Sequence, residues 1–194
     1  MSQININNIT NRTGDSGPVI AGVSSVSSSG FMVMPSGDTA IRGAGSGRGV
    51  FARGTNPNTY SNTMDYVTIA STGNAIDFGD SSDNDHFPAS CASSTRGLIM
   101  GGGGNPAEIT TIEYVTISSS GGANDFGELS IAYYASAGLS NSTRGVVAGV
   151  ETPSATNIID FVTIATTGNA IDFGDLTAAR RGCTGFSDVH GGLG

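Results

Sequence analysis

The sequence repeats itself three times, and this internal period constrains the fold more than any other feature. The segments MDYVTIASTGNAIDFGD (64–80), IEYVTISSSGGANDFGE (112–128) and IDFVTIATTGNAIDFGD (159–175) align without a gap. Their aromatic positions recur 48 and then 47 residues apart. Self-similarity over roughly forty to fifty residues is typical of proteins in which each copy is one supersecondary unit that packs on its neighbours.

A second element recurs in phase with the first. It appears as GRGVFARG (47–54), TRGLIMGGG (95–103) and TRGVVAGV (143–150), and HGGLG (190–194) is a partial fourth copy. An Arg-Gly pair followed by an apolar run and then by glycines indicates a buried strand whose flat face admits close neighbours.

The rest of each copy also has the pattern of short strands. In YVTIAST (66–72) the side chains alternate between two faces, the following TGN indicates a tight turn, and AIDF forms a further strand. A more variable segment follows the Gly-Asp pair. The chain of 194 residues holds 30 glycines, and a composition rich in Gly, Ser, Thr and Asn disfavours helices. The sequence therefore predicts an all-β fold with about four short strands per copy.

The chain is expected to have two parts. Residues 45–194 form a β-repeat domain with units at about 48–95, 96–143 and 144–194, whereas residues 1–44 do not match the repeat. This first part carries too little apolar surface to offset the entropy of ordering it alone. We therefore expect residues 1–44 to be an extended N-terminal segment for attachment or oligomerisation, or else to be disordered.

The repeat also resembles known families. Its Arg-Gly-apolar-Gly-Gly strand, its aromatic-centred second strand and its period of about 48 residues resemble Kelch-like propeller blades. The sequence pattern YVTI-x3-GNAIDFGDLT-x-AR-x-G is similar to repeats of fibre and appendage proteins of tailed bacteriophages. This resemblance covers residues 45–194. It implies a structural subunit of the virion, namely a short fibre, neck appendage or decoration protein, with a secondary role in adsorption to the host surface.

The resemblance and the number of copies both imply partners. Residues 1–44 are similar to the N-terminal pieces of phage fibre proteins, which serve in trimerisation and in docking to other virion proteins. Three units close into a ring only awkwardly, and an open array leaves sheet edges exposed. We therefore expect a homo-oligomer, either a trimer, as in fibres, or a dimer that completes a ring of six units.

Charge and targeting signals exclude other partners. The net charge is −8 and the eight basic residues are scattered arginines, so neither nucleic acid nor an anionic membrane surface is an expected partner. Cys91 and Cys183 are far apart and belong to no metal-binding cluster, so zinc is not expected. Their small-residue, apolar surroundings favour buried free thiols over a disulfide. The start MSQININNIT lacks the pattern of a signal peptide. We expect a protein that is made in the host cytoplasm and located in the virion.

Residues that recur in every copy are expected to serve the fold. Asp77 and Gly79, with their equivalents in the other copies, are interpreted as turn residues, and Arg48, Arg96 and Arg144 as partners of carboxylates or of loop carbonyls. No catalytic residue, cofactor or enzymatic activity is predicted; an enzyme such as a glycan hydrolase is the most distant alternative. A weak calcium pattern is formed by Asp80, Asp83 and Asp85, for which a plain acidic loop is the competing interpretation.

Residues that break the repeat are better candidates for binding. One aligned position of the variable segment reads Asp-His, Tyr-Tyr and Arg-Arg in the three copies. Aromatic rings stack on sugar faces and charged groups bind hydroxyls, so this position is a candidate rim for a carbohydrate or a protein. The candidate ligand-binding residues are His86, Tyr133, Tyr134, Arg180 and Arg181, and the loops 56–60, 105–108 and 151–155 are candidate contributors to the same rim. The alternatives are surface variation or a contact between subunits, and the competing functional class is a cell-encoded, lectin-like adhesin.

Overall fold

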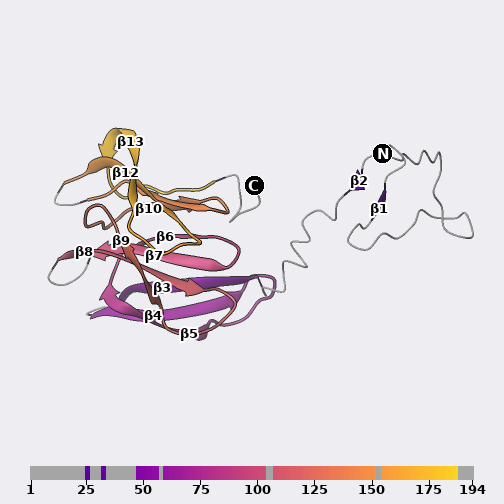
Figure 1. The fold of residues 1–194 in the computed structure, drawn as a ribbon. Coiled ribbons are helices and arrows are strands. Elements are labelled where there is room, and N and C mark those ends of the chain that lie inside the picture. The colour runs from indigo at the N-terminus through magenta and orange to yellow at the C-terminus, as the bar shows by residue number, and fades with distance from the viewer. Residues whose placement is uncertain are drawn as a thin grey trace, which may run out of the picture. The chain divides into compact units, whose positions relative to one another are not determined.

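Figure 1 shows a computed structural model of the chain. The structure describes residues 25–26, 32–33, 47–56, 59–103, 107–151 and 154–187. The chain divides into two parts, Met1–Ala44 and Gly45–Gly194. In the first part, β1 (Ser25–Val26) pairs antiparallel with β2 (Met32–Val33). The predicted N-terminal attachment segment otherwise lies outside the described residues.

The second part is all-β, which confirms the all-β part of the predicted fold: its described residues form three antiparallel sheets and no helix. Sheet 1 contains β3 (Arg48–Asn56), β4 (Thr59–Thr68) and β5 (Ile76–Asp85). Sheet 2 contains β6 (Ala89–Ala92), β7 (Arg96–Gly103), β8 (Glu108–Thr116) and β9 (Asn124–Glu128). Sheet 3 contains β10 (Ala137–Ser140), β11 (Arg144–Ala148), β12 (Thr156–Thr163) and β13 (Ile171–Arg180).

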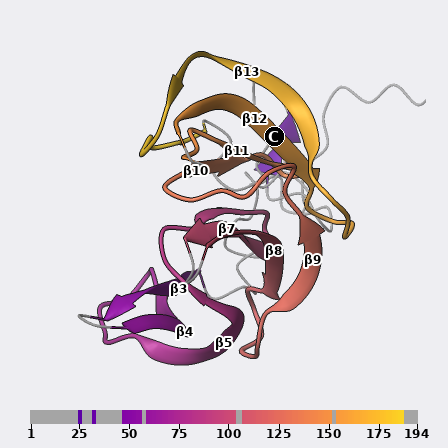
Figure 2. The same cartoon turned by 90° about the vertical axis from the view of Figure 1, so that its left-hand side faces the viewer.

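Each strand of a sheet pairs with the next strand along the chain, and the three sheets lie side by side with sheet 2 in the middle (Figures 1 and 2). Hydrophobic side chains fill the spaces between them. The core between sheets 2 and 3 includes Leu98, Met100, Phe126 and Val162. A smaller cluster of Met64, Phe78, Ile99 and Val115 lies between sheets 1 and 2.

The Asp-Phe-Gly motif forms a β-bulge rather than the predicted turn. In sheet 1 the register shifts between Met64 and Asp65, so that Gly79 lies opposite Met64 and Asp77 opposite Asp65. The same shift occurs at the equivalent position in sheets 2 and 3. Gly79 has a φ of 134°, in the region that favours glycine. The sequence indicated a glycine requirement, but the bulge depends on strand pairing that a local pattern does not contain.

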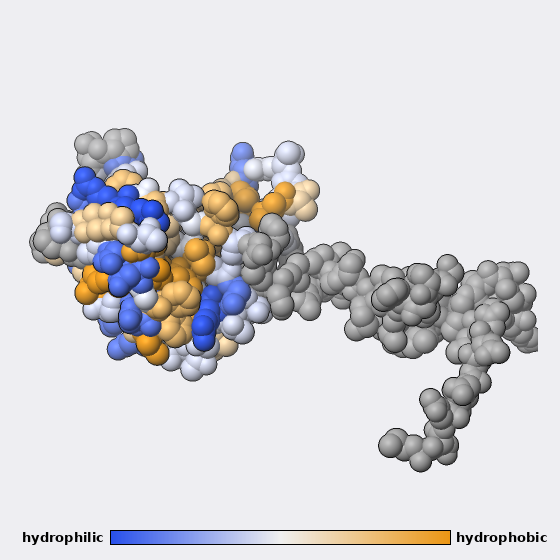
Figure 3. All heavy atoms as spheres, turned by 90° about the horizontal axis from the view of Figure 1, so that it is seen from above, coloured by the Kyte–Doolittle hydropathy of each residue, from blue (hydrophilic) through white to orange (hydrophobic). Residues whose placement is uncertain are grey.

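No helix in the described ranges is long and apolar enough to cross a membrane. On the face seen from above in Figure 3, hydrophobic side chains reach the surface between hydrophilic ones.

Candidate functional site

Two of the three recurring arginines, Arg48 and Arg96, join neighbouring sheets. Arg48 donates from Nη1 to the carbonyl oxygen of Ile117 at 3.4 Å, and Arg96 donates to that of Ile164 at 3.0 Å. Each guanidinium also stacks on an aromatic ring of its own sheet, 4.3 Å from the centroid of Tyr66 and 4.4 Å from that of Tyr114. The sequence predicted that these arginines bind either carboxylates or loop carbonyls. Arg48 and Arg96 bind loop carbonyls.

Backbone hydrogen bonds repeat at the same two junctions. Between sheets 1 and 2, Gly121 N donates to the Phe78 carbonyl at 2.7 Å and Ala123 N to that of Asp80 at 2.9 Å. Between sheets 2 and 3, the equivalent amides of Gly168 and Ala170 donate to the carbonyls of Phe126 and Glu128, at 2.8 and 2.7 Å. The Asp-Phe-Gly bulge of one sheet is thus bound by the turn of the next.

A buried carboxylate completes each junction, with different partners. In sheet 2, Glu113 accepts hydrogen bonds from Ser81, Ser82 and Arg53 of sheet 1. Burial alone would raise the pKa of Glu113, but these hydrogen bonds outweigh burial and hold the pKa below its usual value. The equivalent Asp160 in sheet 3 instead accepts from Ser130 N at 3.0 Å and from the Tyr133 hydroxyl at 2.8 Å.

The acidic loop surrounds an arginine. The Arg53 side chain is fully buried and pairs with Asp83, Asp85 and Glu113. Burial raises the pKa of Asp85, although the Arg53 guanidinium opposes this shift. The carbonyl of Asp80 is bound to Ala123 at the junction. Within the described part of the chain no three His, Cys, Asp or Glu residues are grouped to hold a metal ion, and Arg53 supplies the positive charge between Asp83 and Asp85.

Arg53 was missed by the sequence reasoning, although a signal was present. It occupies the position at which the other copies have Gly101 and Gly149. All three have positive φ, 59° for Arg53, 62° for Gly101 and 74° for Gly149. A charged residue in a left-handed conformation where its equivalents are glycine breaks the repeat.

Three of the five candidate binding residues are brought together. The His86 ring stacks on Tyr60 with centroids 4.7 Å apart and planes 2° apart, and lies 6.4 Å from Tyr134. The Tyr134 hydroxyl donates to Glu151 at 2.7 Å, and Glu151 pairs with Arg181. This group, with the neighbouring Phe87, is called the aromatic rim below.

The other two candidates lie elsewhere. Tyr133 is fully buried, and burial raises the pKa of its hydroxyl, which donates to Asp160. Arg180 is exposed at the end of β13, opposite Thr156. Tyr60 and Glu151 reach the rim from the loops 56–60 and 151–155, and sequence reasoning missed only Phe87, which follows His86. Phe87 is 60% exposed with a φ of 54°, a conformation unusual for a bulky residue.

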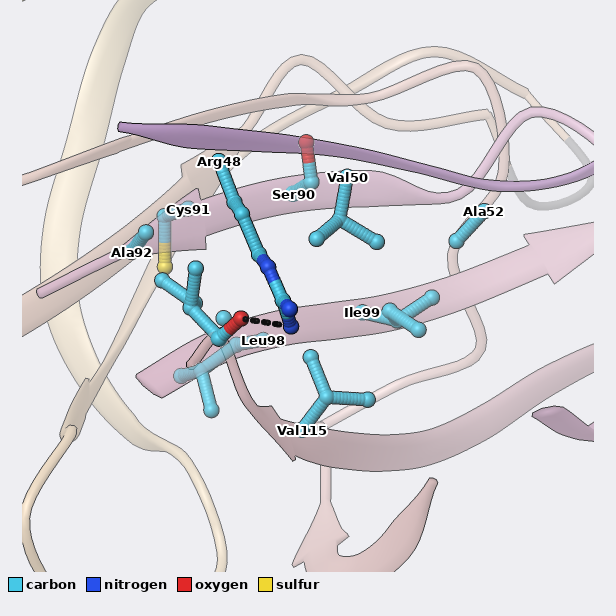
Figure 4. Close-up of a pocket in the computed structure, with 11 residues that line it drawn as sticks. Arg48, Val50, Ala52, Ser90, Cys91, Ala92, Leu98, Ile99 and Val115 are labelled. Carbon is cyan, nitrogen blue, oxygen red and sulfur yellow. Dashed lines mark hydrogen bonds between the residues drawn. The ribbon is translucent and has the colours of Figure 1, made fainter. Parts of the chain in front are cut away.

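An apolar cavity of about 240 Å³ lies between β3 and sheet 2 (Figure 4). Arg48, Val50 and Ala52 line it from β3, with the Arg48 side chain extending across it, and Leu98, Ile99 and Val115 line it from sheet 2 (Figure 4). Cys91 borders it, and burial raises the pKa of this thiol to about 12. Both cysteines are free and half-buried. A thiol with such a pKa stays protonated at neutral pH.

A scan against protein-family models finds no match to this chain, and a search of the curated proteins finds none that is similar to it.

Proposed function

We propose that this chain is a non-catalytic structural subunit of a tailed-phage virion: a short fibre, neck appendage or decoration protein. In this proposal the three sheets are Kelch-like propeller blades of about 48 residues, and residues 1–44 attach the subunit to other virion proteins. The similarity of residues 45–194 to phage appendage repeats supports the assignment to a virion.

One structural observation carries the structural role. Groups that recur in the copies are used at both junctions between sheets: Arg48 and Arg96 bind carbonyls, the first two Asp-Phe-Gly bulges accept from turns, and the acidic residues of β8 and β12 accept from hydroxyls. A group that is present in every copy and hydrogen-bonded in place serves packing rather than one asymmetric reaction centre. The module is therefore suited to building an assembly.

The test of the virion role uses intact particles. Antibodies against the purified chain should label virus particles from the source of this sequence at one fixed structural position, and peptide mass spectrometry of those particles should detect the chain. Particles that carry neither the label nor the peptides would refute the assignment.

The aromatic rim supports a second candidate function, binding of a glycan. Exposed Phe87, the stacked pair of His86 and Tyr60, and the Glu151–Arg181 pair place rings beside hydrogen-bonding groups. This combination suits the apolar face and the hydroxyls of a sugar. In a phage this site would serve adsorption, and in a cell-encoded protein it would serve adhesion.

A glycan array tests the second candidate. We expect binding that Phe87→Ala abolishes and that Phe51→Ala, which alters another exposed aromatic residue, leaves unchanged. An array on which no glycan binds, or equal loss with both variants, would exclude the rim as a glycan site.

A further inference from the structure

Sheets 1 and 3 each have one free side, and each free side carries one half of the contact that joins neighbouring sheets elsewhere in the chain. Phe78 and Phe126 are each 2% exposed because the next sheet covers their bulge, whereas the equivalent Phe173 of sheet 3 is 52% exposed. At the other end, Ile164 is 1% exposed against the preceding sheet, whereas the equivalent Ile69 of sheet 1 is 72% exposed. The apolar surfaces left open at the two ends correspond to the two sides of one interface.

The polar groups at the two ends match as well. In sheet 1, Gly73 and Ala75 stand at the positions whose backbone amides donate hydrogen bonds across each junction. No described residue accepts a hydrogen bond from the amides of Gly73 and Ala75. The carbonyls of Phe173 and Asp175 are equivalent to the acceptors. Gly79 and Gly127 leave no room for a Cβ, which would lie 2.5 Å from the facing turn, while the equivalent Gly174 has no atom within 4 Å.

The segment Thr184–Ser187 already occupies the first strand position of a fourth sheet. Ser140 donates from Oγ to the carbonyl of Ala92 at 2.7 Å, which holds β10 against β6. Ser187 donates in the same way to the carbonyl of Ser140 at 2.8 Å. This segment therefore lies along β10 as β10 lies along β6.

Sheet 1 offers the complementary edge. Its described residues form three strands instead of four, so that β3 has a partner on only one side. In sheets 2 and 3 the extra strand is the first one, β6 or β10, which pairs with β7 or β11. A strand in the position of β6 would pair with β3.

Phe186 and the cavity of Figure 4 are a further matching pair: an exposed side chain at one end and an empty space near the other. Phe186 is 88% exposed and is equivalent to Cys91, whose Sγ approaches Gly145 between sheets 2 and 3. Gly97 in sheet 2 is equivalent to Gly145 in sheet 3. Next to Gly97, between sheets 1 and 2, no side chain fills the position that Cys91 fills next to Gly145, and the empty space there is the cavity beside Val50. An apolar cavity of roughly 150 Å³ can hold a benzene ring, so 240 Å³ accommodates a phenyl group.

We propose that a second copy of this chain docks head to tail, with sheet 3 of one copy against sheet 1 of the next. Thr184–Ser187 of the first copy adds to β3 of the second in the register of β10 on β11, which places Phe186 opposite Val50 and its ring in the cavity. The turn at Gly73–Ala75 of the second copy binds the bulge at Phe173. Because the two surfaces differ, repetition of this contact produces a closed ring or an open filament.

Residues 41–44 of the same chain are the alternative segment for this position, but they would fill the cavity less well than Phe186 of a second copy. By the period, residues 41–44 are equivalent to β6, and Gly43 stands at the position of Cys91 and Phe186. A glycine has no side chain with which to fill 240 Å³. The inference deepens the proposed structural role and rests on it, since it names the partner through which the subunit assembles.

Disulfide trapping tests the register. In the full chain with Cys91→Ser and Cys183→Ser, the pair Thr184→Cys and Ala52→Cys corresponds to the facing residues Ala137 and Ala148. Facing residues of antiparallel strands lie within the Cα distance that a disulfide spans. We expect oxidation to link separate chains. Thr184→Cys with Phe51→Cys, one residue out of register and on the opposite face, is the matched control and should link at least tenfold less.

A solution measurement gives a second readout. The wild-type chain should sediment as an oligomer, and Phe186→Asp or Phe173→Asp should weaken association at least tenfold while circular dichroism stays unchanged. Phe87→Asp alters an exposed aromatic residue outside this interface and should leave association unchanged. A monomeric wild type, equal linking in both cysteine pairs, or a disulfide within one chain would overturn the proposal. Chains that associate in this register but are missing from virus particles would refute only the virion role.

Discussion

Arg53 is the residue on which the junction between sheets 1 and 2 depends most. Its buried guanidinium lies among Asp83, Asp85 and Glu113, so its removal leaves buried carboxylates without a counter-charge. Removing one partner of a buried ion pair lowers the free energy of unfolding by about 3–5 kcal/mol. We expect Arg53→Met to lower the free energy of unfolding by about this amount in urea titration, and Arg181→Met, which alters an exposed arginine, to change it by less than about 0.5 kcal/mol. Equal effects would contradict this role of Arg53.

Acid stability depends on Glu113. Its pKa in the folded state lies below the ordinary 4.5, so the unfolded state binds the proton first as the pH falls. The stabilising contribution is complete above a pH of about 4.5 and is lost as the pH falls through the lower folded pKa. Between about pH 6 and about pH 3, Glu113→Gln should therefore lose less unfolding free energy than the wild type. Asp85, whose pKa is raised, has the opposite sign; Asp85→Asn should make the acid loss steeper.

At this scale the sequence predicted which positions differ between copies, but not where their side chains point. Breaks in the repeat identified His86 and Tyr134, which do meet at the rim. The neighbouring Tyr133 turns into the core because its hydroxyl binds Asp160, a residue 27 positions away. Contacts between sheets decide that orientation, and a comparison of aligned copies does not contain them.

Among the elements, the Asp-Phe-Gly bulge has the strictest steric demand. Gly127 and Gly174 have φ values of 147° and 138°, so alanine at either position adds backbone strain of about 1–3 kcal/mol. Only at Gly127 would the added Cβ also meet the facing turn, 2.5 Å from the Gly168 oxygen. We expect Gly127→Ala to destabilise the chain by about 1–3 kcal/mol more than Gly174→Ala, measured by urea unfolding at concentrations where the chain is monomeric. Equal losses would show that the strain alone matters.

Alternating side chains and glycine punctuation allowed the strands to be predicted. They did not indicate the bulge, because that irregularity exists only between paired strands. The extra pairing partner expected for β3 likewise lies outside any local pattern.

For the whole molecule, the repeat period predicted an all-β chain built from copies of one unit, since each apolar face needs a neighbouring copy to cover it. The sheets are not equally secured. Sheet 2 has cores on both sides, and the core toward sheet 3 is larger than the core toward sheet 1.

This difference predicts the order of opening. In dilute solution, amides of sheet 1 should exchange with deuterium before those of sheets 2 and 3, and the amides around Leu98 and Ile112, which are fully buried in sheet 2, should exchange last. Hydrogen exchange followed by mass spectrometry measures this order. A single rate for all three sheets would indicate that the module opens only as a whole.

The two junctions are similar in layout but differ in chemistry: Arg53 neutralises one buried acid, and Tyr133 binds the other. A unit copied or moved within the gene by unequal recombination would face the wrong counterpart, an acid with no cation or a cation with no acid. The three copies have therefore lost their interchangeability, and lengthening this chain by duplication would require compensating changes at each new boundary.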